Sequence, residues 1–316
     1  MNKQNSSEMT MANQMPSQWN APSMEAYSES KTPAPRASVG KTILLVLGTI
    51  IGYLVVSRLS GIVLASIDPQ MGQYKLMTFA AIPMLIFYVC MIVFVMKKKK
   101  VLTAKGNGFG EGLITAMFWL YVCASSVLSV FLVQEKNQMP HFELPKDLTF
   151  GSEQIWCILA VLLSAGICEE LMCRGLILNA LRDRFGRDTA KGTILAIALS
   201  GVIFGCIHFI NLLAGVSFQA VIIQVLGATG MGFYLGTVYC RCGNIKVTIF
   251  LHFLMDICVL LPASMSGSAG LTGAIDDTMN SPVKFLGIFL YTGLSAFLLR
   301  PSMQPMLFKY SLEDDK

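Results

Sequence analysis

Three short patterns place acids, histidines and an arginine inside long apolar segments of this chain. They are Glu169-Glu170-Leu171-Met172-Cys173-Arg174, Phe204-Gly205-Cys206-Ile207-His208 and His252-Phe253-Leu254-Met255-Asp256. A charged side chain in apolar surroundings is costly, so we expect each one to have a partner or a chemical task. Because carboxylates and imidazoles commonly transfer protons, the patterns point to a hydrolytic site or to a proton relay.

The spacing within the patterns suggests different tasks for neighbouring residues. Glu170 and Arg174 are four residues apart and share one face of a helix, so we expect them to form an ion pair. Glu169 is rotated by about 100° on the same helix and faces elsewhere, free to act as a general base. His252 and Asp256 are also four apart, and we expect Asp256 to hold the imidazole in one tautomer.

The three patterns are expected to meet at one depth of the membrane. Consecutive antiparallel helices bring together residues that are equidistant from the turn between them, and the midpoint of Glu169 and His208 falls at Asp188-Thr189 in a basic turn. His252 follows another basic turn by about nine residues, or about 14 Å of helix. The three side chains can therefore converge in the cytoplasmic half or near the midplane.

The composition is that of a polytopic membrane protein. Of 316 residues, 54% are hydrophobic and only 14% are charged, whereas soluble domains contain about 25% charged residues. These figures exclude a soluble two-domain enzyme, a disordered chain and, despite the net charge of +5, a nucleic-acid-binding protein. Nine cysteines, an odd number lying mostly in apolar runs, do not indicate a disulfide framework.

The fold expected is all-α, a bundle of about eight transmembrane helices. Segments near the roughly 20 residues that a span requires occur at about 42–66, 77–96, 112–133, 154–180, 193–210, 216–239, 247–261 and 283–299. The sequence divides into a disordered polar cytoplasmic tail (1–41), three spans with their loops (42–153), a four-helix catalytic core (154–261), and an outer loop, last span and short cytoplasmic tail (262–316). The sixth span contains a Gly232-x-x-x-Gly236 step, which favours close helix packing.

Basic residues set the expected orientation. With eight spans, all five Lys- and Arg-rich segments fall on one side of the membrane, and the 262–281 loop, which has no basic residue, falls on the other. Basic loops are typically cytoplasmic, so both termini are expected in the cytoplasm.

The order E-E-x-x-x-R, F-x-x-x-H and H-x-x-x-[N/D] on separate helices resembles the CPBP family, also called Abi. This family includes the CAAX prenyl endopeptidases of the Ras-converting type, and the resemblance covers residues 154–261. It implies an intramembrane endopeptidase in the cell membrane that opens towards the cytoplasm. By the same motifs it implies catalytic residues Glu169, His208, His252 and Asp256, supported by Glu170, Arg174 and Phe204.

One departure from the eukaryotic members concerns Asp256, where those enzymes carry Asn. An Asn amide can donate a hydrogen bond to an oxyanion, whereas an Asp donates only when protonated. The cofactor question also stays open, because a single zinc ion at Glu169, His208 and His252 and a metal-free glutamate mechanism both fit the residue types. The sequence lacks the H-E-x-x-H pattern of many zinc proteases, which favours the metal-free mechanism.

Two classes of function therefore remain open from the sequence. The first is a peptidase whose partners are the lipid bilayer and a peptide or membrane-protein substrate. The second is a non-enzymatic transporter or bacteriocin-immunity-type protein that uses the buried acid and histidines for proton relay or partner binding. A relay needs polar groups towards both faces, and the chain concentrates them at one depth, which favours hydrolysis.

Overall fold

The computed structural model describes residues 35–103, 108–118, 150–265 and 283–308, with single residues or pairs between these stretches. In this part of the chain six helices are long and apolar enough to cross a membrane. They are α2 (Val39–Ile67), α3 with its continuation η1 (Gln73–Val95), a long helix at Ser152–Phe185, α9 with η4 (Ala190–Ala214), α10 (Phe218–Cys242) and α11 (Ile245–Met265).

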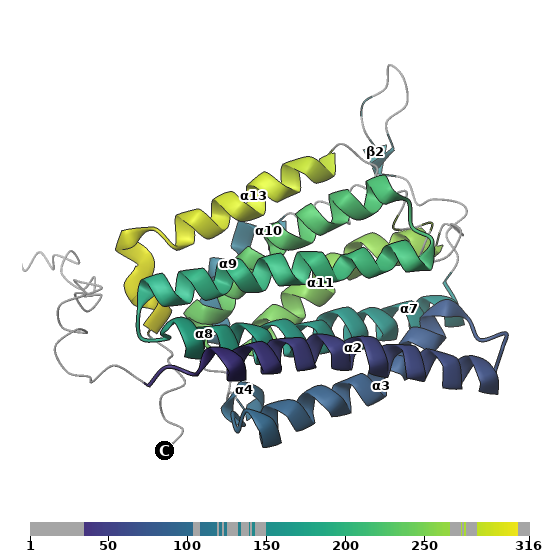
Figure 1. Cartoon of the computed structure of the whole chain (residues 1–316). Helices are drawn as coiled ribbons and strands as arrows, with labels where there is room; N and C mark the ends of the chain where they lie inside the picture. The colour runs from purple at the N-terminus through teal and green to yellow at the C-terminus, as the bar shows by residue number, and fades with distance from the viewer. Residues whose placement is uncertain are drawn as a thin grey trace, which may run out of the picture. The chain divides into compact units, whose positions relative to one another are not determined.

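The remaining elements are short. α4 (Lys100–Thr103) and α5 (Phe109–Thr115) follow the second long helix, and β1 (Leu132–Val133) pairs antiparallel with β2 (His141–Phe142). After α11 come α13 (Val283–Leu298) and the 3₁₀ segment η5 (Pro301–Phe308). Figure 1 shows α9, α10, α11 and α13 running side by side, with α2 and α3 beside the long helix.

The predicted helical class is confirmed, and six of the expected spans correspond to the six long helices. The expected span 283–299 corresponds to α13, which is shorter than the others. The expected span 112–133 is wrong at its end, because Leu132–Val133 is a strand whose backbone pairs with His141–Phe142. Most of its centre lies outside the described residues, so a total of eight spans stays a prediction.

The helix Ser152–Phe185 carries the first pattern and is not a regular α-helix. It begins as α7 (Ser152–Ala160), widens into the π-helical segments η2 (Val161–Glu169) and η3 (Leu171–Leu178), and ends as α8 (Asn179–Phe185). Wide turns of this kind are rare and occur often at functional sites. The two acids Glu169 and Glu170 lie where the two wide segments meet.

Glycines allow α9 and α10 to approach closely. A Cβ on Gly232 would lie 2.7 Å from the Cα of Gly201, and one on Gly205 would lie 2.0 Å from the hydroxyl oxygen of Thr229. Larger side chains at these positions would push the two helices apart, as expected for small residues at a helix crossing in lipid. α10 then ends at Gly243, whose left-handed backbone (φ 64°) suits glycine.

Candidate active site

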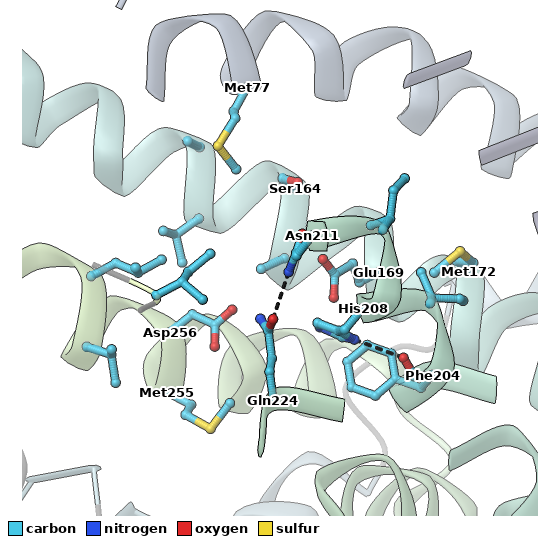
Figure 2. A pocket seen from close by; sticks show the side chains of 18 of the residues that line it. Met77, Ser164, Glu169, Met172, Phe204, His208, Asn211, Gln224, Met255 and Asp256 are labelled. Carbon is cyan, nitrogen blue, oxygen red and sulfur yellow. Dashed lines mark hydrogen bonds between the residues drawn. The ribbon is translucent and has the colours of Figure 1, made fainter. Parts of the chain in front are cut away.

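A cavity of about 260 Å³ lies between the long helices and gathers most of the predicted site residues (Figure 2). Its walls come from α2, α3, the Ser152–Phe185 helix, α9 with η4, α10 and α11. The lining residues are Tyr53, Met77, Ala160, Val161, Ser164, Ala165, Glu169, Met172, Phe204, Ile207, His208, Ile210, Asn211, Gln224, Met255, Asp256, Val259, Leu260 and Ile275. The cavity is therefore mainly apolar, with a few converging polar groups, as is usual for ligand sites.

The two adjacent glutamates have different surroundings. The Glu170 side chain is fully buried and accepts a hydrogen bond from Arg174 Nη1 at 2.7 Å, which confirms the ion pair expected from their spacing. The Glu169 side chain is 23% exposed and lines the cavity. Glu170 is thus held inside the protein, whereas Glu169 is the acid that a substrate or a water molecule can reach.

His252 lies behind the cavity wall and is surrounded by three carboxylates. Its Nδ1 lies 2.8 Å from Glu170 Oε1, and its Nε2 lies 3.8 Å from Glu169 Oε2 and 3.6 Å from Asp256 Oδ2. Because Glu170 Oε1 also accepts from Arg174, the Nδ1 of His252 is the donor in the bond to Glu170. Its other nitrogen faces the two carboxylates of the cavity.

This arrangement corrects one expectation for Asp256. The residue does line the cavity, but it approaches Nε2 of His252, and the tautomer is fixed through Nδ1 by Glu170. The reason is that one imidazole has two nitrogens on opposite edges. The i,i+4 step along α11 reaches only Nε2, while an acid from another helix reaches Nδ1.

His208 lies at the point where α9 gives way to the 3₁₀ turn η4 (His208–Ala214). Its Nδ1 is 2.9 Å from the carbonyl oxygen of Phe204. A carbonyl can only accept a hydrogen bond, so Nδ1 carries the proton and donates. In the neutral ring Nε2 is then a hydrogen-bond acceptor, available to a water molecule in the cavity that His208 lines.

Phe204 connects the parts of the site. Its ring contacts His208 and His252 edge-on, at centroid distances of 5.0 and 5.7 Å, and the guanidinium carbon of Arg174 lies 5.0 Å from its centroid. The side chain is 1% exposed. An aromatic ring in this position fixes both imidazoles and covers the Arg174 charge with its face.

Two polar residues of the cavity lie outside the three sequence patterns. Asn211 Nδ2 donates to Gln224 Oε1 at 2.7 Å, which ties η4 to α10 (Figure 2). Two signals could have revealed them. Asn211 follows His208 by three residues, and Gln224 is a polar residue in an otherwise apolar stretch of α10. Both signals are weak, because an uncharged amide is less costly in a membrane than a charge and so points less strongly to a function.

The structure thus brings Glu169, Phe204, His208 and Asp256 to one cavity, with His252 directly behind it. Glu170 and Arg174 form the buried support. In the described part of the chain, no group of three His, Cys, Asp or Glu side chains lies close enough to hold a metal ion.

Comparison with known proteins agrees with the motifs. Residues 151–258 match the family model described as type II CAAX prenyl endopeptidase Rce1-like. This range, about a third of the chain, contains every predicted site residue together with Asn211 and Gln224. No curated protein matches the chain. With its six long apolar helices, the chain is a multi-pass membrane protein, and its residues 151–258 are similar to the Rce1-like type II CAAX prenyl endopeptidases.

Proposed function

We propose that the chain is an intramembrane endopeptidase that hydrolyses a peptide bond with water activated by Glu169 and His208. The observation that carries the proposal is the cavity in which a reachable carboxylate and a histidine with a free Nε2 lie together among apolar walls. The family match, which implies a protease of this kind, supports the same reaction class.

The proposed reaction uses groups of the chain alone. Glu169 takes a proton from a water molecule while the water oxygen bonds to the carbonyl carbon of the substrate, and His208 Nε2 accepts a hydrogen bond from the same water. The tetrahedral intermediate then collapses, the C–N bond breaks, and Glu169 returns the proton to the leaving nitrogen. The products are a new carboxyl terminus and a new amine.

His252 and Asp256 have separate tasks in this proposal. His252 Nε2 lies between Glu169 and Asp256 and so orients the base without entering the cavity itself. Asp256, which is 25% exposed, faces the substrate and favours a positively polarised group, such as the leaving amine, beside it. Glu170 and Arg174 hold His252 in place.

The substrate we propose is a peptide or membrane protein whose segment at the cleavage site is apolar. The cavity is lined largely by apolar side chains, among them Met77, Val161, Val259 and Leu260. Such walls stabilise a bound apolar segment by burying it. We also propose eight spans with both termini in the cytoplasm, on the basis of the basic loops.

Hydrolysis can be tested with purified protein in proteoliposomes and a panel of quenched fluorescent peptides. The panel contains a farnesylated CAAX peptide, its unprenylated form and apolar transmembrane peptides. In water labelled with ¹⁸O, hydrolysis adds one labelled oxygen to the new carboxyl terminus, which mass spectrometry detects. We expect at least one peptide to be cleaved in this way.

Two variants make this test specific. Glu169→Gln removes the base, whereas Glu153→Gln makes the same change at an exposed acid of the same long helix. We expect the first variant to lose cleavage and the second to keep it. If no peptide is cleaved but the liposomes show a proton flux that Glu169→Gln abolishes, the transporter function is correct and the proposed one is wrong.

A further inference from the structure

The reaction proposed above requires a group that stabilises negative charge on the substrate oxygen, and none of the motif residues supplies it directly. When water adds to the carbonyl carbon, the carbonyl oxygen becomes an oxyanion and needs N–H or O–H donors nearby.

The two histidines have no donor free for this purpose. The only N–H of neutral His208 is on Nδ1, which donates to the carbonyl oxygen of Phe204. In His252, Nδ1 donates to Glu170, and Nε2 is directed between Glu169 and Asp256 behind the cavity wall. His252 is not among the residues that line the cavity, and the N–H of His208 is already used, so neither ring presents a free donor to it.

Asp256 is a poor donor for a different reason. A carboxyl group donates a hydrogen bond only when it is protonated, and its ionised form repels an oxyanion. Its Oδ2 already faces His252 Nε2 at 3.6 Å. A neutral donor elsewhere on the cavity wall is required.

The amides of Asn211 and Gln224 meet this requirement. Both line the cavity, from η4 and α10, and Asn211 Nδ2 donates to Gln224 Oε1 at 2.7 Å. That bond uses one N–H of Asn211 and one acceptor of Gln224. The second N–H of Asn211 and both N–H groups of Gln224 have no other hydrogen-bond acceptor among the described residues.

The conclusion does not depend on how the two amides are turned. If both were reversed, Gln224 would donate to Asn211 and the whole NH₂ group of Asn211 would be left over. In each orientation the pair retains at least three N–H bonds that can point into the cavity. Figure 2 shows Gln224 between Asp256 and His208, with Asn211 on the side of Gln224 that lies towards Ser164.

We propose that the Asn211–Gln224 amide pair donates the hydrogen bonds that stabilise the oxyanion of the substrate in this cavity. The inference rests on the proposed peptidase function and adds two catalytic residues outside the three motifs. The mutual hydrogen bond holds both amides in place before the substrate arrives, so little reorganisation is needed during the reaction.

The test compares variants of Gln224 with a matched control on the same helix. Gln224→Met is nearly isosteric and removes the donors. Gln224→Glu removes them too but keeps an acceptor for Asn211, so it retains the tie between η4 and α10. Gln219→Glu makes the same change at an exposed position five residues away. Cleavage of the best peptide from the panel gives kcat and KM, and detergent melting gives Tm.

We expect both Gln224 variants to lose about 10²–10³-fold in kcat with KM nearly unchanged. The reason is that the oxyanion forms only in the transition state and the tetrahedral intermediate, and not in the bound substrate. Gln219→Glu is expected to match the wild type. If the pair were only a structural tie, Gln224→Glu would keep its kcat, and Gln224→Met would lower Tm and raise KM. That result would overturn the inference.

A second readout uses binding alone. A peptide aldehyde forms a hydrate that resembles the tetrahedral intermediate, whereas the alcohol of the same sequence does not. The wild type is expected to prefer the aldehyde, and Gln224→Met to lose that preference while binding the alcohol normally. An unchanged preference would contradict the inference. If Glu169→Gln is inactive while the Gln224 variants retain full kcat, the peptidase function stands and only the role of the amides is wrong.

Discussion

Glu170 Oε1 lies 2.8 Å from Nδ1 of His252 and thereby links the long helix Ser152–Phe185 to α11. The same oxygen accepts from Arg174 Nη1 at 2.7 Å, and Arg174 Nη2 reaches the carbonyl oxygen of Gly232 on α10 at 3.4 Å. One buried carboxylate thus connects a cation on its own helix to an imidazole on another. The position of His252, and through it that of the reachable Glu169, depends on this link.

Removing Arg174 is expected to destabilise the protein strongly. In Arg174→Ala the fully buried Glu170 loses its cation, and breaking a buried pair in this way typically costs about 3–5 kcal/mol. Thermal unfolding in detergent should show a much lower Tm, whereas Arg184→Ala, at a less buried position of α8, should change little. A wild-type Tm for Arg174→Ala would mean that the pair contributes nothing to the fold.

The sequence predicted this pair because both partners lie on one helix, where spacing alone brings them together. It did not predict that Glu170 would also hold His252, since that contact joins residues 82 positions apart on different helices. Similarly, Phe204 was expected only to support the site, and its contacts with both imidazoles depend on how α9 and α11 pack.

The fold, like the site, was predicted where local sequence determines it and missed where contacts between distant residues determine it. Long apolar segments predicted six spans closely, because hydropathy depends on composition alone. Two local features were missed. The chain leaves the regular helix at His208, and Leu132–Val133 pairs as a strand. Both depend on hydrogen bonds to partners that hydropathy does not identify.

A second prediction concerns pH and Lys98, which lies outside the long helices. Its Nζ is 2.5 Å from Asp183 Oδ2, and Asp183 also binds Arg187. Burial, together with the Arg187 charge, lowers the pKa of Lys98 to about 8, and Asp183 opposes the shift only in part. An unfolded Lys has a pKa of about 10.4.

The sign of the effect follows from the two pKa values. Between about pH 8 and 10.4 the unfolded chain binds the extra proton, so the Lys98 contribution to the free energy of unfolding rises with pH there, by at most about 3 kcal/mol. Below pH 8 Lys98 is charged in the folded protein as well, and the full destabilisation caused by burying that charge is present. The Tm of the wild type should therefore approach that of Lys98→Met as pH rises from 7.5 to 9.5. A constant difference would contradict the assigned shift, and the exposed Lys99→Met serves as the control.

The membrane topology gives a third prediction. Eight spans place Lys316 in the cytoplasm, on the same side as the basic segments. A reporter fused after Lys316 that is active only outside the cytoplasm should give no signal, and a reporter active only inside should give a strong one. The reverse pattern would require an odd number of spans, or the opposite orientation.

Metal removal gives a fourth prediction. The proposed reaction uses Glu169 and His208 without a metal ion, and the described side chains do not form a three-ligand site. Peptide cleavage should therefore survive dialysis against EDTA and 1,10-phenanthroline, with less than a twofold change in kcat. Loss of activity that zinc restores would instead favour the metalloprotease mechanism.

The central claim is that Glu169 is the base that activates water, and the rate of peptide cleavage by Glu169→Gln tests it most directly. The substitution keeps the shape of the side chain and removes its ability to take a proton, so kcat should fall by about 10²–10⁴-fold while Tm stays near the wild-type value. Adding His208→Ala should reduce the rate little further, since residues that act as a unit are not additive. A folded Glu169→Gln protein that cleaves the peptide at close to the wild-type rate would contradict the claim.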